Sequence, residues 1–239
     1  MMKDNYERIG ALTGLAAVLL TIVGFVIVLP KPPAPDAAAI AYGNFYKNHT
    51  NEIRATVAIL SVALGFYVWF LGSLSAALRA AIGNPRLPTV AFGGGIVGAM
   101  FFVISLTATA TAAYRPDETS PELVRMLSDI GYVVAAPAAA GFFVLLAATA
   151  LVILRTTLLP SWLGWVSLAG AIANLGGVFV IFTTSGALAA DGVVGLFLPI
   201  IGFVVPIAAL SVVIAQKSQG DTLGGKIGGA VDRVTGQRL

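Results

Sequence analysis

Six long stretches without a charged residue constrain the fold of this chain more than any other feature. The hydrocarbon core of a bilayer is about 30 Å thick, and a helix needs about 20 apolar residues to cross it. Every stretch is long enough to do so, which predicts an all-α integral membrane protein, a bundle of six transmembrane helices. The stretches are Ile9–Leu29, Ala55–Leu78, Leu87–Tyr114, Ile130–Leu154, Thr156–Ala190 and Gly192–Gln216.

Composition excludes the main alternatives. Only 10% of the residues are charged, whereas soluble domains carry about 25%. The strands of a membrane β-barrel would be segments of about 10 residues with alternating polarity, and the runs here are continuous and longer. The chain has no cysteine, which excludes disulfides and thiolate nucleophiles. Its Lys and Arg residues form no cluster of the kind that binds nucleic acid, so we expect the lipid bilayer as its surroundings.

We expect one transmembrane domain over residues 1–217 and a polar tail over residues 218–239. The first uncharged run is longer than the h-region of a signal peptide, so it is expected to be a retained helix. The glycine pairs at 224–225 and 228–229 disfavour a stable helix, so we expect a disordered cytoplasmic tail. The six helices are expected at about residues 9–29, 55–79, 88–113, 130–154, 160–183 and 193–216.

The distribution of basic residues predicts the orientation of the chain. With six spans and a cytoplasmic N-terminus, nine Lys and Arg residues fall on the cytoplasmic side and five on the other side. Cytoplasmic loops carry the excess of Lys and Arg, so both termini are expected inside.

Two longer loops lie on the outer side in this topology. In the first, Asp36 is expected to cap a short segment, Ala37–Lys47, whose aromatic residues favour a position on the membrane surface. In the second, Ser120 and Pro121 have the pattern of a helix start, so the fourth helix is expected to begin in water. Pro137 predicts a kink where this helix continues into the bilayer.

Two helix pairs resemble each other in sequence. The segment Gly65–Phe70 aligns with Gly141–Leu146, and Leu78-Arg79 aligns with Leu154-Arg155 at the same offset. This indicates a parallel repeat that relates helices 2-3 to helices 4-5 by a pseudo-two-fold axis along the membrane normal, an architecture known from transporters. Chance similarity between apolar helices is the alternative.

Small residues recur at helical spacing. The run Gly93–Gly98 satisfies G-x-G-x-x-G, but it lies inside a membrane span and lacks the strand that a dinucleotide site requires. Small residues four positions apart instead allow close helix approach, either within a compact bundle or in a dimer. The expected packing residues are Gly10, Gly14, Gly94, Gly98, Ala169, Ala173 and Gly177.

The expected membrane cores contain no ionisable residue, which argues against a proton-driven transporter or an intramembrane hydrolase. The polar residues that remain are Asn174, Ser61, Ser105, Thr107, Thr109 and Thr111, and Asn174 is expected to bond a neighbouring helix more than a substrate. Pro199 and Pro206 are expected to kink the sixth helix, or else to expose carbonyls to a substrate. His49 and the outer acidic residues Asp117, Glu118, Glu122 and Asp129 form no metal motif, so no metal, cofactor or catalytic residue is assigned.

Two segments with a recurring pattern of aromatic and glycine residues resemble a known family. They are Trp69–Arg79, which reads WFLGSLSAALR, and Leu159–Leu168, which reads LPSWLGWVSL. With the long loop after the first helix, they make the chain resemble a bacterial multi-pass family catalogued as domain of unknown function 4386. The resemblance implies a bacterial inner membrane and supplies no site residues.

Three functions follow from these features. The first is a non-catalytic accessory or scaffolding subunit that packs against a partner membrane protein or against another copy, because small-residue faces are present and no catalytic site is visible. The second is a binder or transporter of lipid or another apolar molecule. The third is an enzyme at the outer face that uses His49 and the acidic loop. The expected residues of an apolar ligand site are Phe66, Tyr67, Trp69, Phe142, Phe143 and Asn174.

Overall fold

The computed structural model describes residues 2–157 and 159–235, and it contains no strand over those ranges. Six helical segments are long and apolar enough to cross a membrane, which confirms the predicted helical class and number of spans. These spans are Arg8–Val28, Thr50–Ile82, Arg86–Tyr114, Pro121–Leu154, Ser161–Phe182 and Val193–Lys217.

The spans contain more than six elements because several are interrupted. The α-helices are α1 (Met2–Ile22), α2 (Ala39–Asn48), α3 (Thr50–Ile82), α4 (Arg86–Tyr114), α5 (Pro121–Val133), α6 (Ala135–Leu154), α7 (Ser161–Val178) and α8 (Leu198–Thr235). Three short elements of other geometry are η1 (Val23–Val28), η2 (Phe179–Phe182) and η3 (Val193–Phe197).

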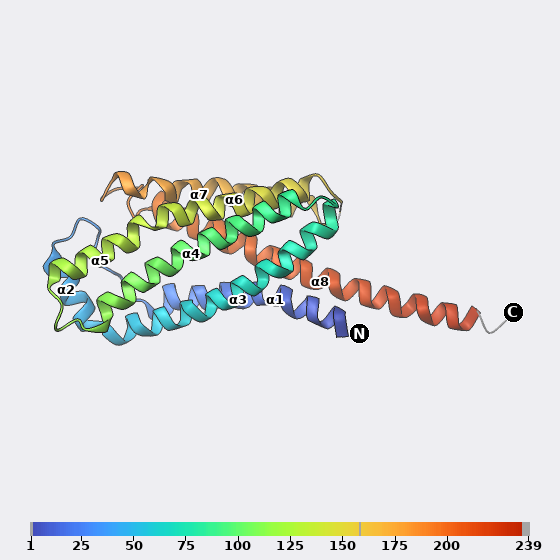
Figure 1. The fold of residues 1–239 in the computed structure, drawn as a ribbon, viewed down its shortest axis with the longest axis horizontal. Coiled ribbons are helices and arrows are strands. Elements are labelled where there is room, and N and C mark those ends of the chain that lie inside the picture. The colour runs from blue at the N-terminus through green and yellow to red at the C-terminus, as the bar shows by residue number, and fades with distance from the viewer. Residues whose placement is uncertain (1, 158, 236–239) are drawn as a thin grey trace.

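The six spans form a closed ring. Each span packs against the next one along the chain, and the ring closes where α1 packs against α8. Both termini lie at one end of the bundle, which we call the termini end, and α2 and α5 lie at the other end (Figure 1). We call α2 and α5 together the cap, and their end of the bundle the cap end.

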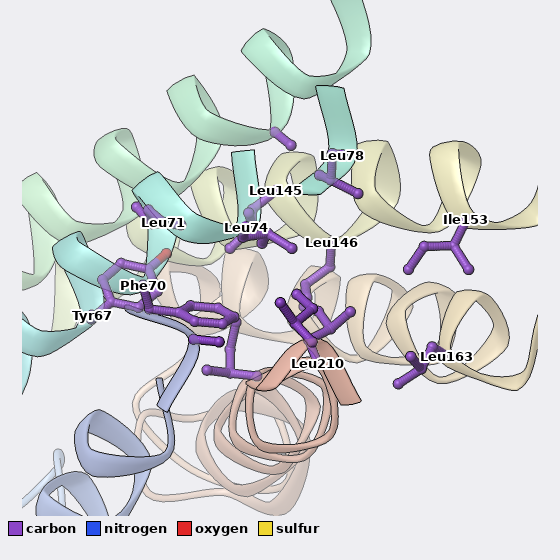
Figure 2. Close-up of a cluster of buried hydrophobic side chains, with 14 of the residues drawn as sticks. Tyr67, Phe70, Leu71, Leu74, Leu78, Leu145, Leu146, Ile153, Leu163 and Leu210 are labelled. Atoms are coloured by element: carbon purple, nitrogen blue, oxygen red, sulfur yellow. The ribbon is translucent and has the colours of Figure 1, made fainter. Parts of the chain in front are cut away.

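The centre of the ring is filled by large apolar side chains from α3, α6, α7 and α8 (Figure 2). Lipid tails are as apolar as these side chains, so their stabilising contribution in a membrane comes from close van der Waals packing. The buried residues at the centre include Tyr67, Phe70, Leu71, Leu74, Leu78, Leu145, Leu146, Ile153, Leu163 and Leu210.

Glycine residues bring α4 and α6 into backbone contact. A Cβ atom added at Gly94 would lie 2.7 Å from the backbone nitrogen of Leu145, and one added at Gly98 would lie 2.5 Å from the ring of Phe142. A Cβ atom added at Gly141 would overlap the backbone nitrogen of Gly98. The predicted packing residues Gly94 and Gly98 therefore lie in this contact, together with Gly141 from the other helix.

The other expected packing residues face several different helices, and one of them is exposed. Gly10 and Gly14 face α3, where an added Cβ atom at Gly14 would lie 2.6 Å from the Phe70 ring. Gly177 and Ala173 face α6 and α8. Ala169 is exposed, and the neighbouring Gly170 takes the expected place against the carbonyl oxygen of Gly202 on α8. Two of the three residues predicted for the packing face of α7 therefore lie in it, and Gly170 replaces the third.

A serine joins the first and last spans. The hydroxyl of Ser211 on α8 is fully buried, accepts a hydrogen bond from Leu15 N at 2.9 Å and donates one to the carbonyl oxygen of Ala11. Leu15 and Ala11 are four residues apart, so Ser211 is inserted at one step of the α1 hydrogen-bond ladder. Ser211 was not among the polar residues predicted to be important from sequence.

Proline and cap residues fall close to their predicted places. Ser120 accepts a hydrogen bond from Leu123 N at 3.4 Å, which confirms it as the N-cap of α5. The fourth span breaks at Val134, because Pro137 has no N–H to donate to the carbonyl of Val133. Pro206 lies inside α8, and Pro199 is the second residue of this helix, directly after η3.

Two local predictions differ from the structure. The N-cap of α2 is Ala38, and no side chain caps this helix, so Asp36 does not have the predicted role. Helix α8 continues to Thr235, whereas the sequence analysis expected disorder from residue 218. Glycine lowers helix propensity by about 1 kcal/mol relative to alanine but does not block the helical conformation, and no proline follows Pro206. Residues 236–239 lie outside the described part of the chain.

Substitution of Gly141 by Ala tests the α4–α6 contact. The added methyl group would overlap the Gly98 backbone, so we expect the variant to lose about 1–3 kcal/mol of stability. The matched control is Gly65→Ala, because Gly65 aligns with Gly141 in the sequence repeat but has no atom within 4 Å of an added Cβ. Thermal unfolding in detergent, followed by size-exclusion chromatography, measures both. Equal midpoints for the two variants would contradict the contact.

Candidate functional site

The predicted aromatic residues do not converge on one ligand site. Tyr67 is buried and Phe142 is half-buried, and both pack against Phe203 of α8 with ring centroids 5.4 and 4.5 Å from it. Phe143 is half-buried beside the same core. Phe66 and Trp69 are exposed on the outside of α3. The rings at the centre therefore fill space between the helices, and the exposed pair faces the surroundings of the bundle.

Asn174 is buried but bonds its own helix. Its side-chain nitrogen donates a hydrogen bond to the carbonyl oxygen of Gly170 at 2.8 Å, one turn earlier on α7. This local bond satisfies a donor that would otherwise be costly in an apolar environment. The hydrogen bond between helices that was expected of Asn174 is made instead by Ser211.

His49, Asp117 and Glu118 were predicted to lie on the outer side and were considered as residues of an enzyme site. Each of them pairs with a different partner. His49 Nδ1 lies 3.9 Å from one carboxylate, that of Glu52. Asp117 lies 3.9 Å from Lys47, and Glu118 lies 3.6 Å from Arg115. Within residues 2–157 and 159–235, no group of three His, Asp or Glu side chains is placed to hold a metal ion.

A groove lies between α3 and α4 near the cap end. It has a volume of about 470 Å³. Val57, Ser61 and Leu64 line it from α3. The rest of the lining comes from α4 and the loop that follows it: Val103, Leu106, Thr107, Ala110, Thr111, Tyr114, Arg115 and Thr119. Ser61, Val103 and Thr107 are exposed, so the groove opens on the outside of the bundle.

The chemistry of the groove changes from its buried floor to its exposed rim. Leu64, Leu106 and Ala110 are apolar, whereas Ser61, Thr107 and Thr111 bring hydroxyl groups. Each hydroxyl donates its proton to a carbonyl oxygen of its own helix at 2.7–2.8 Å. The helix satisfies these polar groups without charge, so the lining suits an apolar molecule with a polar end.

Two arginines lie where the groove reaches the end of α4. Arg115 follows the last residue of α4, and its guanidinium lies 5.6 Å from the ring centroid of Tyr114. Arg54 on α3 donates hydrogen bonds to the carbonyl oxygens of Ala113 at 3.1 Å and Tyr114 at 2.8 Å. Its cation therefore compensates the negative C-terminal end of the α4 dipole.

The cap packs beside this end of the groove as a second apolar cluster. Tyr42 and Tyr46 of α2 are buried with Ala112 and Ala113 of α4 and Val124 of α5. The aromatic face of α2 thus packs against protein, and the position of this segment on the membrane surface stays a prediction. Burial raises the pKa of Tyr46 above its ordinary value of 10.0, and the Ser128 hydroxyl, 3.3 Å from the phenol oxygen, partly opposes this rise.

Several groove residues could be named from sequence, but their arrangement in one groove could not be predicted. Ser61, Thr107 and Thr111 were among the polar residues of the spans, and Arg115 is one of the five Lys and Arg residues counted on the outer side. Phe203 and Ser211 were missed, because a Phe or Ser in an apolar helix carries no local signal of its partner. The short α3–α4 turn was the available clue, since it makes the two helices antiparallel neighbours.

The chain matches no protein-family model, no curated protein and no solved structure. The resemblance to the bacterial multi-pass family therefore stays a prediction that rests on the two segments described above.

The cap is expected to lose stability at high pH. The folded pKa of Tyr46 lies above that of the unfolded chain, so its contribution is complete below pH about 10 and falls as the pH rises further. The measurement is the tyrosinate absorbance of the wild type minus that of Tyr46→Phe, titrated from pH 8 to about 12. We expect a difference curve with a midpoint above 10; a midpoint at or below 10 would show that Tyr46 is not buried in the cap.

Proposed function

We propose that this protein binds a membrane lipid, with an apolar chain lying in the groove between α3 and α4. The observation that carries the proposal is the groove itself, whose volume of about 470 Å³ falls in the range of small-ligand sites, about 300–1,000 Å³. Its apolar depth, neutral hydroxyls and outward opening suit a molecule that enters sideways from the bilayer. Because the groove is built from two transmembrane helices, its ligand is already concentrated around it.

The proposal includes a place and an orientation in the cell. We propose a bacterial inner membrane, on the resemblance to the multi-pass family, and a cytoplasmic location of both termini, on the excess of Lys and Arg. The cap and the arginine end of the groove would then face away from the cytoplasm. The parallel repeat of helices 2-3 and 4-5 also stays a proposal, with Gly65 exposed on α3 and Gly141 buried on α6.

An accessory or scaffolding subunit is the second candidate, and one observation favours it. Added Cβ atoms at Gly65 and Gly72 would meet no atom within 4 Å, and these glycines lie seven residues apart on one exposed face of α3. A partner helix could approach closely there. The other small-residue faces, at Gly10, Gly94 and Gly170, are used inside the bundle and no longer support this function.

Filling the groove tests lipid binding. Ala110→Trp places a large ring among Leu64, Leu106 and Thr107, so the variant is expected to lose most of the lipid that the wild type retains on gentle extraction. The matched control is Val62→Trp, since Val62 is 56% exposed on α3 next to Ser61 and does not line the groove. Mass spectrometry of retained lipid and protein measures both, and thermal unfolding confirms that each variant is folded.

Three results are distinguishable. Lipid lost in Ala110→Trp and kept in Val62→Trp would support the proposal. Equal lipid retention in both variants would contradict it. A stoichiometric membrane protein retained by the wild type and lost in Gly65→Leu, with lipid unchanged, would establish the accessory function instead.

Cysteine labelling tests the orientation on this cysteine-free chain. Arg86 begins α4 at the termini end and Thr119 follows α4 at the cap end, so cysteines at the two positions are expected to react with an impermeant maleimide from opposite sides of the membrane. In intact cells only Thr119→Cys should be labelled. Labelling of both from outside would overturn the six-span topology, and labelling of Arg86→Cys alone would reverse the orientation.

A further inference from the structure

The end of the groove carries a charge pattern that the apolar lining does not explain. The Arg115 guanidinium lies at the end of α4 where the groove lining changes from hydroxyls to charge. Its side chain is 66% exposed, and its carboxylate partner Glu118, at 3.6 Å, is 73% exposed. Exposed ion pairs of this kind contribute little stability, about 0–1 kcal/mol, so an anion from the surroundings can replace the carboxylate at small cost.

Arg54 reduces the repulsion that the end of α4 would exert on an anion. A helix C-terminus normally presents unpaired carbonyl oxygens, which repel negative charge. Here Arg54 donates to the carbonyl oxygens of Ala113 and Tyr114, which are among the last four of α4 and so have no partner within the helix. These two carbonyls are therefore occupied, and a second cation stands beside Arg115.

The nearest acidic residues do not cancel these cations. Glu118 pairs with Arg115, and Asp117 lies 3.9 Å from Lys47 of α2, so its charge is shared with another cation. Two cations, Arg54 and Arg115, therefore face one carboxylate, Glu118, at the Arg115 end of the groove, which we call its mouth. The net charge of the mouth is positive. A phosphate group suits such a mouth, because guanidinium forms charge-assisted and often bidentate hydrogen bonds with phosphate oxygens.

We propose that the Arg115 guanidinium recognises the phosphate of an anionic glycerophospholipid whose acyl chain lies in the α3–α4 groove. This inference rests on the proposed lipid-binding function and adds the class of the headgroup. A net negative lipid is preferred to a zwitterionic one, because the positive mouth attracts the phosphate and repels a cationic amine. Arg54 acts as a positioning residue that occupies the α4 carbonyls, and Glu118 competes with the phosphate for Arg115.

The test measures headgroup preference in nanodiscs. The full-length protein is placed in discs of phosphatidylcholine that contain a minor fraction of phosphatidylglycerol with the same acyl chains, and native mass spectrometry counts each lipid retained per protein. The wild type is expected to enrich phosphatidylglycerol, and Arg115→Gln to lose about fivefold of that enrichment. Arg86→Gln, at the opposite end of α4, is the matched control and should keep it.

A second variant changes the preference in the opposite direction. Glu118→Gln removes the competing carboxylate, so the enrichment of phosphatidylglycerol should rise above that of the wild type. This result keeps the test decisive if Arg115→Gln folds poorly. Both effects should weaken as salt is raised, because the charges are exposed and screened.

The remaining outcomes distinguish a failure of the headgroup inference from a failure of the proposed lipid-binding function. Equal retention of the two lipids by the wild type, with both lost in Ala110→Trp, would overturn the headgroup inference and leave lipid binding intact. Retention of both lipids in Ala110→Trp would overturn the lipid-binding function as well. Binding of inorganic phosphate by the wild type, without any enrichment of phosphatidylglycerol, would show that the site takes a free anion and would also overturn the inference.

Discussion

The close approach of α4 and α6 at Gly94, Gly98 and Gly141 is the contact on which the rest of the bundle depends. No hydrophobic driving force operates between helices in lipid, so a membrane bundle relies on contact area, and glycine provides it by removing side chains from the interface. Helix α4, held against α6, also contacts α3 at Gly95, where the Tyr67 hydroxyl lies 3.4 Å from the Gly95 carbonyl oxygen. Beyond that contact, toward the cap, α3 and α4 line the groove.

Polar groups are treated differently in the centre and at the cap end. In the centre, Ser211 donates a hydrogen bond to a carbonyl oxygen of another helix, and Asn174 donates one to a carbonyl oxygen of its own helix. At the cap end, hydroxyls and Arg115 line an opening on the outside of the bundle, and Arg54 bonds the nearby end of α4. Buried polar groups in a membrane need internal partners, whereas exposed cations near the interface can take partners from lipid. The cap end is therefore the part of this molecule best suited to recognition.

The six spans and the start of α5 could be predicted from sequence because local chemistry decides them. The length of an uncharged run alone decides whether a helix can cross the bilayer. A serine followed by a proline, as at Ser120 and Pro121, is a local signal for the start of a helix. The rotation of each helix could not be predicted, because helices apolar on every side have no polar face to set it. For this reason Gly170 packs where Ala169 was expected, and Trp69 faces outward while Tyr67 is buried. The groove likewise depends on the register between α3 and α4, which no single residue encodes.

The most direct test of the account is a high-resolution cryo-electron microscopy map of the protein in nanodiscs that contain phosphatidylglycerol. The account predicts an elongated density between Leu64 and Ala110 that ends in a headgroup within hydrogen-bond distance of the Arg115 guanidinium. A map in which α3 and α4 close over the groove, or in which ordered lipid lies only elsewhere on the bundle, would contradict it.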